Sequence, residues 1–132
     1  MPKSLDRLQP WGAFVLRLAL GLSMAVHGYE KVVPHNATAH FAHYVVSLGM
    51  PYWLGVVSAY TEFLGGVLLL LGLLTRIAAA LICINMLVAL ITVGIHQGFG
   101  IYNYIFALVA IAFMLAVNGA GALSLDRRVG IS

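Results

Sequence analysis

Four long apolar runs dominate this chain of 132 residues and leave little sequence between them. They cover residues 11–33, 52–74, 76–96 and 101–117, and each approaches the roughly 20 residues that a helix needs to cross a bilayer. A soluble domain of this size exposes too much of its surface to bury so many apolar side chains. The mean hydropathy of +1.00 therefore indicates that lipid forms part of the solvent.

The apolar runs are continuous rather than alternating, which favours helices over the strands of a membrane barrel. The length allows one domain, covering residues 1–132. We therefore predict an all-α membrane protein built as a four-transmembrane-helix bundle. Arg17 lies inside the first run, which argues against a cleaved signal peptide, so we expect that run to remain as a span.

The segment between the first two runs has a different pattern. Its apolar residues Phe41, Tyr44, Val45 and Leu48 recur at helical spacing among histidines and other polar residues. This pattern predicts a short interfacial amphipathic helix that lies on the membrane surface between helices 1 and 2.

The basic residues predict the orientation of the spans. Most of them fall on one side of a four-span chain: Lys3, Arg7, Arg76, Arg127 and Arg128. Lys31 lies near the other side, so the positive-inside rule places both termini in the cytoplasm. The basic residues form no stripe interleaved with aromatic residues, and we expect no nucleic-acid partner.

Charged residues make up only 8% of the sequence, yet several polar side chains lie within the apolar runs. Arg17, Glu62 and Asn85 are deep inside three of them, where ionisable groups are costly unless they are paired or face a bundle interior. The rise of ~1.5 Å per residue puts Glu62 and Asn85 near the midplane, with Arg17 within reach of Glu62. We predict that Arg17, Glu62 and Asn85 form a buried polar group. The alternative is that the charged pair only fixes helix register.

Each predicted helix carries its small and polar residues on one face, as helices that pack together in membranes do. The faces are Arg17, Gly21, Met24, Gly28 and Lys31, with His27 at the edge; Gly55, Ser58, Glu62, Gly65 and Gly66; Ala78, Asn85, Ala89, Thr92 and His96; and Asn103, Ala107, Ala110 and Met114. At the outer ends these faces bring together His27, Lys31, His96 and Asn103. We predict that these four residues line one ligand cavity that opens outward.

Two histidines from different helices also admit haem or a metal ion. No H-x-x-H or E-x-x-H spacing supports such a site, and we expect neither ligand. Cys83 is the single cysteine, so the chain forms no internal disulfide or C-x-x-C pair. Any redox chemistry must therefore come from a bound cofactor or a partner protein.

Several short segments together resemble one known family. They include Leu16–Gly21, His27–Lys31, Glu62–Gly66, Leu70–Arg76, Asn85–Ala89 and Ser124–Asp126. This combination is similar to the DoxX family of small bacterial integral membrane proteins. The resemblance implies four membrane helices in the inner membrane and a link to thiosulfate:quinone oxidoreductase or redox homeostasis. The family often has a glutamate near the position of Asn103, and its absence here puts in doubt a proton-transfer role at that position.

The sequence thus predicts a membrane subunit of a quinone-linked redox system that binds quinone or a small sulfur oxyanion in the polar cavity. The alternative is a non-catalytic anchor or accessory protein for a partner, and a third possibility is a permeation pathway for a small solute. We expect a protein partner or a homo-oligomer, because the chain carries no nucleotide-binding motif and no nucleophile elbow. The sequence assigns no catalytic residue.

Overall fold

The computed structural model describes residues 3–131, which are helical and turn segments with no strand among them. The long helices are α2 (Gln9–Val32), α4 (Tyr52–Leu71), α5 (Thr75–Thr92) and α6 (Phe99–Asn118), and each is long and apolar enough to cross a membrane. The short ones are α1 (Lys3–Asp6), α3 (Ala37–Ser47), the 3-10 helix η1 (Gly94–His96) and α7 (Leu125–Val129). The predicted four-helix membrane fold, with a short helix between the first two spans, is confirmed.

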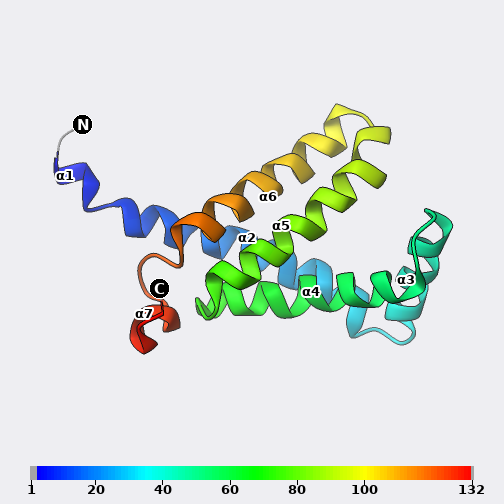
Figure 1. Cartoon of the computed structure of the whole chain (residues 1–132), viewed down its shortest axis with the longest axis horizontal. Helices are drawn as coiled ribbons and strands as arrows, with labels where there is room; N and C mark the ends of the chain where they lie inside the picture. The colour runs from blue at the N-terminus through cyan, green and yellow to red at the C-terminus, as the bar shows by residue number, and fades with distance from the viewer. Residues whose placement is uncertain (1–2, 132) are drawn as a thin grey trace.

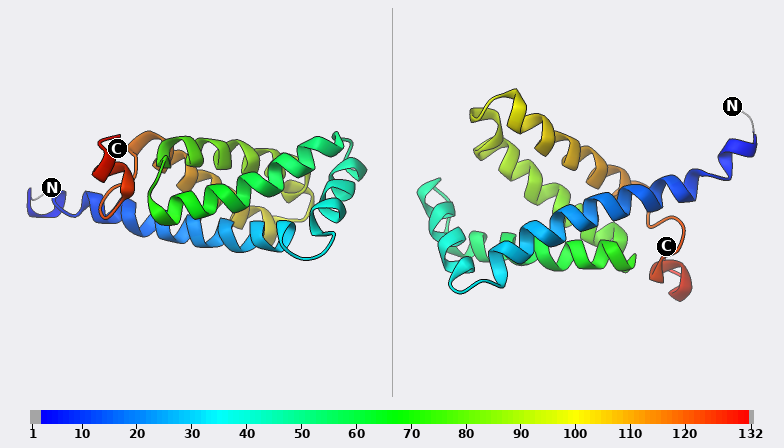
Figure 2. Two further views of the ribbon diagram at one scale, coloured as in Figure 1. Left: turned by 90° about the horizontal axis from the view of Figure 1, so that it is seen from below. Right: turned by 180° about the vertical axis from the view of Figure 1, so that it is seen from behind.

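The long helices are arranged as two pairs. Helix α2 packs along α4, and α5 packs along α6. The two pairs meet near α7 and diverge toward the end that carries α3 and η1 (Figure 1 and the right-hand view of Figure 2). Helices α1 and α7 lie at the closed end of this arrangement (Figure 1).

Glycine contacts set the position of α2 along α4. A Cβ on Gly28 would lie 2.2 Å from the backbone N of Phe63, and one on Gly66 would lie 2.3 Å from the N of Ala25. Gly21 lies against Gly66 and Leu70 in the same way. The absence of side chains lets the two backbones approach closely, as small residues do in other membrane helix pairs.

The buried core lies toward the closed end. In α5 the buried residues include Ala78, Ala79 and Ile82 of its first half, and in α6 they begin only at Leu108. The core cluster consists of Ala13, Leu20, Met24, Leu69, Ala78, Ala79, Ile82, Met86, Leu108, Ala112 and Leu115. Because α6 buries no residue before Leu108, the open end is free to hold a cavity.

The helix boundaries differ from the predicted runs where the backbone turns. Helix α4 ends at Leu71, before the predicted 74, because Gly72 adopts a left-handed conformation with φ +68°. Helix α5 ends at Thr92 rather than 96, and a 3-10 turn leads to Gly98 with φ +86°. Helix α6 continues to Asn118, where Arg76 donates hydrogen bonds to the last carbonyls of the helix, those of Ala116, Val117 and Asn118.

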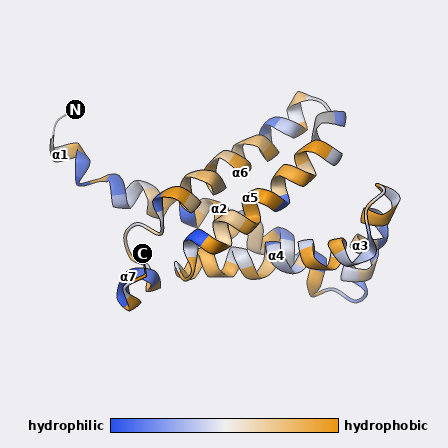
Figure 3. Ribbon diagram, viewed as in Figure 1, coloured by the Kyte–Doolittle hydropathy of each residue, from blue (hydrophilic) through white to orange (hydrophobic). Residues whose placement is uncertain are grey.

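The outward faces of the long helices are apolar. Leu22, Ile77, Ile91, Phe106 and Phe113 are each about 60% exposed, which suits contact with lipid. The hydropathy colouring shows apolar residues along the long helices and hydrophilic ones in α1 and α7 (Figure 3). The structure is thus that of a multi-pass membrane protein.

Candidate ligand site

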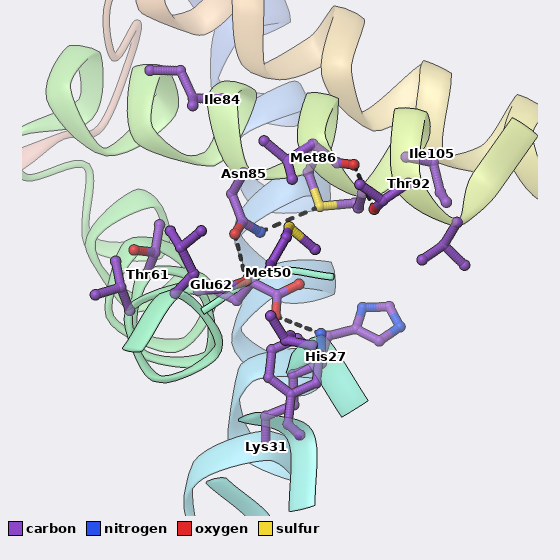
Figure 4. A pocket seen from close by; sticks show the side chains of 18 of the residues that line it. His27, Lys31, Met50, Thr61, Glu62, Ile84, Asn85, Met86, Thr92 and Ile105 are labelled. Atoms are coloured by element: carbon purple, nitrogen blue, oxygen red, sulfur yellow. Dashed lines mark hydrogen bonds and ion pairs between the residues drawn. The ribbon is translucent and has the colours of Figure 1, made fainter. Parts of the chain in front are cut away.

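A cavity of about 430 Å³ lies between the two helix pairs at the open end. Helices α2, α4 and α5 form most of its walls, α3 closes one end, and Tyr104 and Ile105 contribute from α6. Most of the lining side chains are apolar, and the charged ones are Lys31 and Glu62 (Figure 4). Volume and lining are typical of a small-molecule site with a few polar groups in an apolar cavity.

The ion pair between Lys31 and Glu62 is the main polar feature of the cavity. Lys31 Nζ donates to Glu62 Oε2 at 2.6 Å, and the side chain of Glu62 is only 5% exposed, against 29% for Lys31. Lys31 also lies over the ring of Phe41, with Nζ 4.2 Å from the ring centroid. The ammonium group is therefore held at the cavity wall by the Glu62 carboxylate of α4 and the Phe41 ring of α3.

Asn85 extends the polar wall. Ser58 Oγ donates a short hydrogen bond to Asn85 Oδ1, and the Asn85 amide lies 3.8 Å from the sulfur of Met86. Figure 4 shows Asn85 and Glu62 on neighbouring parts of the cavity wall. Of the predicted buried group, Glu62 and Asn85 thus lie in one site.

His27 lies at the edge of the cavity near α6. Its Nδ1 is 2.8 Å from the carbonyl oxygen of Ser23, one turn earlier in α2. A carbonyl oxygen can only accept, so Nδ1 carries the hydrogen and Nε2 of the neutral ring is an acceptor. The ring packs edge-on against Tyr104, whose hydroxyl is 3.1 Å from Ser23 Oγ. These contacts fix the orientation of the imidazole.

The predicted ion pair between Arg17 and Glu62 is wrong. Arg17 is fully buried, but its guanidinium donates to the carbonyl oxygens of Leu69 at 3.3 Å, Ala122 at 3.0 Å and Leu123 at 2.9 Å. The cause is the position of α2: Gly21 lies against Leu70, so Arg17, one turn earlier, lies level with the end of α4. Glu62 lies nine residues before Leu71, the last residue of α4, which is about two and a half turns away.

Arg17 instead belongs to a cluster that joins the closed end of the bundle. A Cβ on Gly72 would lie 1.9 Å from Arg17 Nη1, so this turn needs glycine for space as well as for its positive φ. Asp126 accepts from the backbone N–H groups of Leu74 at 2.6 Å and Thr75 at 2.8 Å, at the start of α5. The Asp126 carboxylate also attracts the Arg17 guanidinium. This cluster holds helix ends together and lies outside the cavity.

Two predicted cavity residues lie elsewhere. His96 is exposed in η1, beyond the end of α5, and does not line the cavity. Asn103 is exposed, and its amide donates to the carbonyl oxygen of Phe99 in the first turn of α6. The prediction of one outer cavity is therefore correct for His27 and Lys31 and wrong for His96 and Asn103. His96 lies past the end of α5, and Asn103 is exposed although its neighbour Tyr104 lines the cavity, so Asn103 lies on another face of α6.

The prediction missed the role of α3 in the cavity. The four residues of its predicted apolar face, Phe41, Tyr44, Val45 and Leu48, all line the cavity. Ala42 packs against Gly55 of α4, where an added Cβ would lie 2.6 Å from the Ala42 Cα. The periodic apolar face is visible in the sequence, but its contact with α4 is not.

The described residues contain no group of three or more His, Cys, Asp or Glu side chains placed to hold a metal ion.

Comparison with known proteins agrees with the architecture. The DoxX family model matches residues 12–96. A relative from Bacillus subtilis (strain 168), named "Putative oxidoreductase CatD", is 34% identical over 116 residues, which cover 87% of this chain and 84% of the relative. No solved structure matches the chain. The family model covers more than half of the sequence, including the segments that form α2, α4 and α5, and the chain belongs to the DoxX family.

Proposed function

We propose that this protein is a membrane subunit of a quinone-linked redox system and that its cavity binds the quinone headgroup beside Lys31 and Glu62. The observation that carries the proposal is the ion pair, which places one ammonium and one carboxylate in the wall of an otherwise apolar cavity. A quinone has the matching chemistry, an apolar ring with carbonyl oxygens that accept hydrogen bonds. The relative named as an oxidoreductase supports the redox class.

Three side chains would handle the headgroup. Lys31 has three N–H donors and uses one on Glu62, which leaves donors for a carbonyl oxygen. Glu62 can hold or release a proton next to that oxygen. His27 offers Nε2 as a further hydrogen-bonding atom at the cavity edge. A bound quinone supplies two-electron, two-proton carrier chemistry, and these residues bind it and handle its protons.

A sulfur oxyanion fits the same residues less well. The charge of Lys31 is already balanced by Glu62 at 2.6 Å, and Arg17 is fixed in the closed-end cluster. An anion in the cavity would therefore meet no net positive charge, and burying an uncompensated charge is costly.

We propose that a partner protein supplies the electrons, since the single cysteine cannot cycle as an internal dithiol.

The binding proposal predicts the effect of Lys31→Met, which keeps much of the side-chain length but removes the donors. Quinone affinity is expected to fall by about 10- to 100-fold, the worth of one hydrogen bond to a charged group. Equilibrium binding of a short-tailed benzoquinone to protein in lipid nanodiscs measures this. Glu30→Gln is the control for the Glu62→Gln substitution that the double variant below contains, because Glu30 is exposed and lies outside the cavity.

The double variant Lys31→Met/Glu62→Gln separates folding from binding. It leaves no buried charge unpaired, so its stability should exceed that of Lys31→Met alone while its quinone affinity stays low. Absence of quinone binding by the parent protein, or parent-like affinity in Lys31→Met, would reject the proposal. The first of these results would favour the accessory-anchor function instead.

We also propose that the protein lies in the bacterial inner membrane with both termini in the cytoplasm. Arg76, Arg127 and Arg128 lie on α5 and α7 at the closed end, whereas Lys31 lies near the open end. A fluorescent reporter fused after the C-terminus is expected to fluoresce. A phosphatase inserted at Gly49 is expected to be active in the periplasm. An inactive phosphatase at Gly49 together with a periplasmic C-terminus would reverse the orientation.

A further inference from the structure

We infer that the cavity opens sideways into the lipid between α4 and α5 and receives its ligand from the bilayer, with the hydrocarbon tail of the quinone leaving through this opening. The inference rests on the proposed quinone function and adds to it the class of ligand and its route. A ligand that enters here is a tailed, membrane-dissolved quinone rather than a water-soluble one.

The opening is marked by cavity-lining residues that are also exposed. Val57 of α4 is 51% exposed, and Leu81, Ile84 and Val88 of α5 are 51%, 60% and 42% exposed. Tyr44 of α3 (45%) and Tyr104 of α6 (44%) also line the cavity and are exposed, but each is single on its helix, whereas α4 and α5 together contribute four such side chains. All four side chains are apolar and come from two helices, so this mouth has an apolar rim.

The mouth lies at the depth of the hydrocarbon core. Ile84 is the tenth of the 18 residues of α5, and Thr61, which also lines the cavity, is the tenth of the 20 residues of α4. Both are therefore near the middle of their spans. In Figure 4, Thr61 and Ile84 lie on the side of Glu62 opposite to His27. The polar groups and the mouth thus occupy different parts of one cavity.

Other sides of the cavity are bridged by contacts between helices. On the α6 side, the Tyr104 hydroxyl and Ser23 Oγ are 3.1 Å apart and join α6 to α2. At the outer end, α3 covers the cavity with Phe41 against Lys31 and with the buried Val45. Between α4 and α5 the corresponding link is the hydrogen bond from Ser58 Oγ to Asn85 Oδ1, and the exposed lining side chains on this side are all apolar.

The physical chemistry of a tailed quinone matches this division. Its ring needs hydrogen-bond donors, which Lys31 provides, and its tail is stable in hydrocarbon. A lateral route keeps the tail in an apolar environment throughout, whereas an outward route would expose each methylene group to water. A cavity of about 430 Å³ holds a headgroup and the first part of a tail, so the rest of a long tail must leave it.

The test compares one benzoquinone headgroup carrying no tail, two isoprenoid units or four isoprenoid units. Affinity is measured in lipid nanodiscs and expressed per lipid, so that partition into the bilayer does not count as binding. Ile84→Trp fills the mouth with a larger side chain. Ile77→Trp is the matched control, because Ile77 lies two turns away on the same face of α5, is also 60% exposed and does not line the cavity.

Ile84→Trp is expected to weaken binding of the four-unit quinone about tenfold and to leave the tailless quinone within about twofold of the parent. Ile77→Trp is expected to change neither. Equal loss for tailed and tailless quinones, or no loss for either, would overturn the lateral opening while leaving quinone binding intact. Failure of the parent protein to bind the tailless ring, together with the tailed quinones, would instead show that the proposed function is wrong.

A second measurement on the unaltered protein does not depend on how the variants fold. A quinone with a diazirine on the first isoprenoid unit of its tail is irradiated in the nanodisc, and the labelled peptides are identified by mass spectrometry. Labels on α4 and α5 near Val57, Leu81 and Val88 are expected. Labels concentrated on α3 would show that the tail leaves toward the outer surface and would overturn the inference.

Discussion

Gly28→Ala is expected to lower the free energy of unfolding by about 3 kcal/mol, because the added methyl group meets backbone rather than a movable side chain. Its Cβ would lie 2.2 Å from the N and 2.4 Å from the Cα of Phe63, so α2 and α4 must separate. Gly12→Ala is the matched control on the same helix, since a Cβ there meets nothing within 4 Å. It is expected to leave stability nearly unchanged.

Cys83 provides the measurement for these variants. It is the single cysteine, it is half-buried on α5, and its sulfur lies 3.8 Å from the carbonyl oxygen of Val109 on α6. A thiol-reactive fluorogenic dye therefore reports the temperature at which α5 and α6 separate. Equal unfolding temperatures for Gly28→Ala and Gly12→Ala would contradict the close contact between α2 and α4.

Arg17→Met is expected to cost about 3–5 kcal/mol, the range seen when one partner of a buried charged network is removed. The substitution leaves the carbonyl oxygens of Ala122 and Leu123 without their donor and removes the positive charge near Asp126. Arg17→Lys should recover only part of the loss, because one ammonium group cannot reach the separate carbonyls that the guanidinium fork joins.

Arg128→Met is the control for the Arg17 variants, since Arg128 is exposed in α7 and its loss should change stability little. Hydrogen exchange adds a local measurement. The backbone N–H groups of Leu74 and Thr75 donate hydrogen bonds to Asp126. Their hydrogens should exchange faster in Arg17→Met than in Arg128→Met. Identical protection in the two variants would show that Arg17 does not hold the C-terminal segment in place.

The sequence predicts the spans well, because length and apolar composition are properties of each helix alone. It also predicts the inward face of α4: Gly55, Glu62, Gly65 and Gly66 are all buried. The amphipathic pattern of residues 35–48 predicts α3 for the same reason. Each of these features depends on local periodicity, which a single sequence displays.

The contacts between helices were harder to predict, because a helical wheel gives directions but not relative depth. The prediction pairs Glu62 with Arg17, yet Lys31 is its partner, because the contacts of Gly21, Gly28 and Gly66 place Arg17 level with the end of α4 and Lys31 beside Glu62. Likewise, the helical wheel places Asn103 toward the interior, but no residue of α6 before Leu108 is buried, and the Asn103 amide donates to Phe99 of its own helix.

The contacts of Arg17 also have a consequence for the order of events during synthesis. The guanidinium enters the membrane with the first span, but its acceptors at Ala122 and Leu123 follow 105 and 106 residues later. At about 5–20 residues per second, translation of that interval takes on the order of 5–20 s. During this time the Arg17 guanidinium lacks two of the hydrogen-bond acceptors that it has in the folded protein. This favours keeping α2 near the lipid headgroups or beside the insertion machinery. The segment after α6 thus completes the contacts of the first helix, and these contacts form only after residues 122 and 123 have been synthesised.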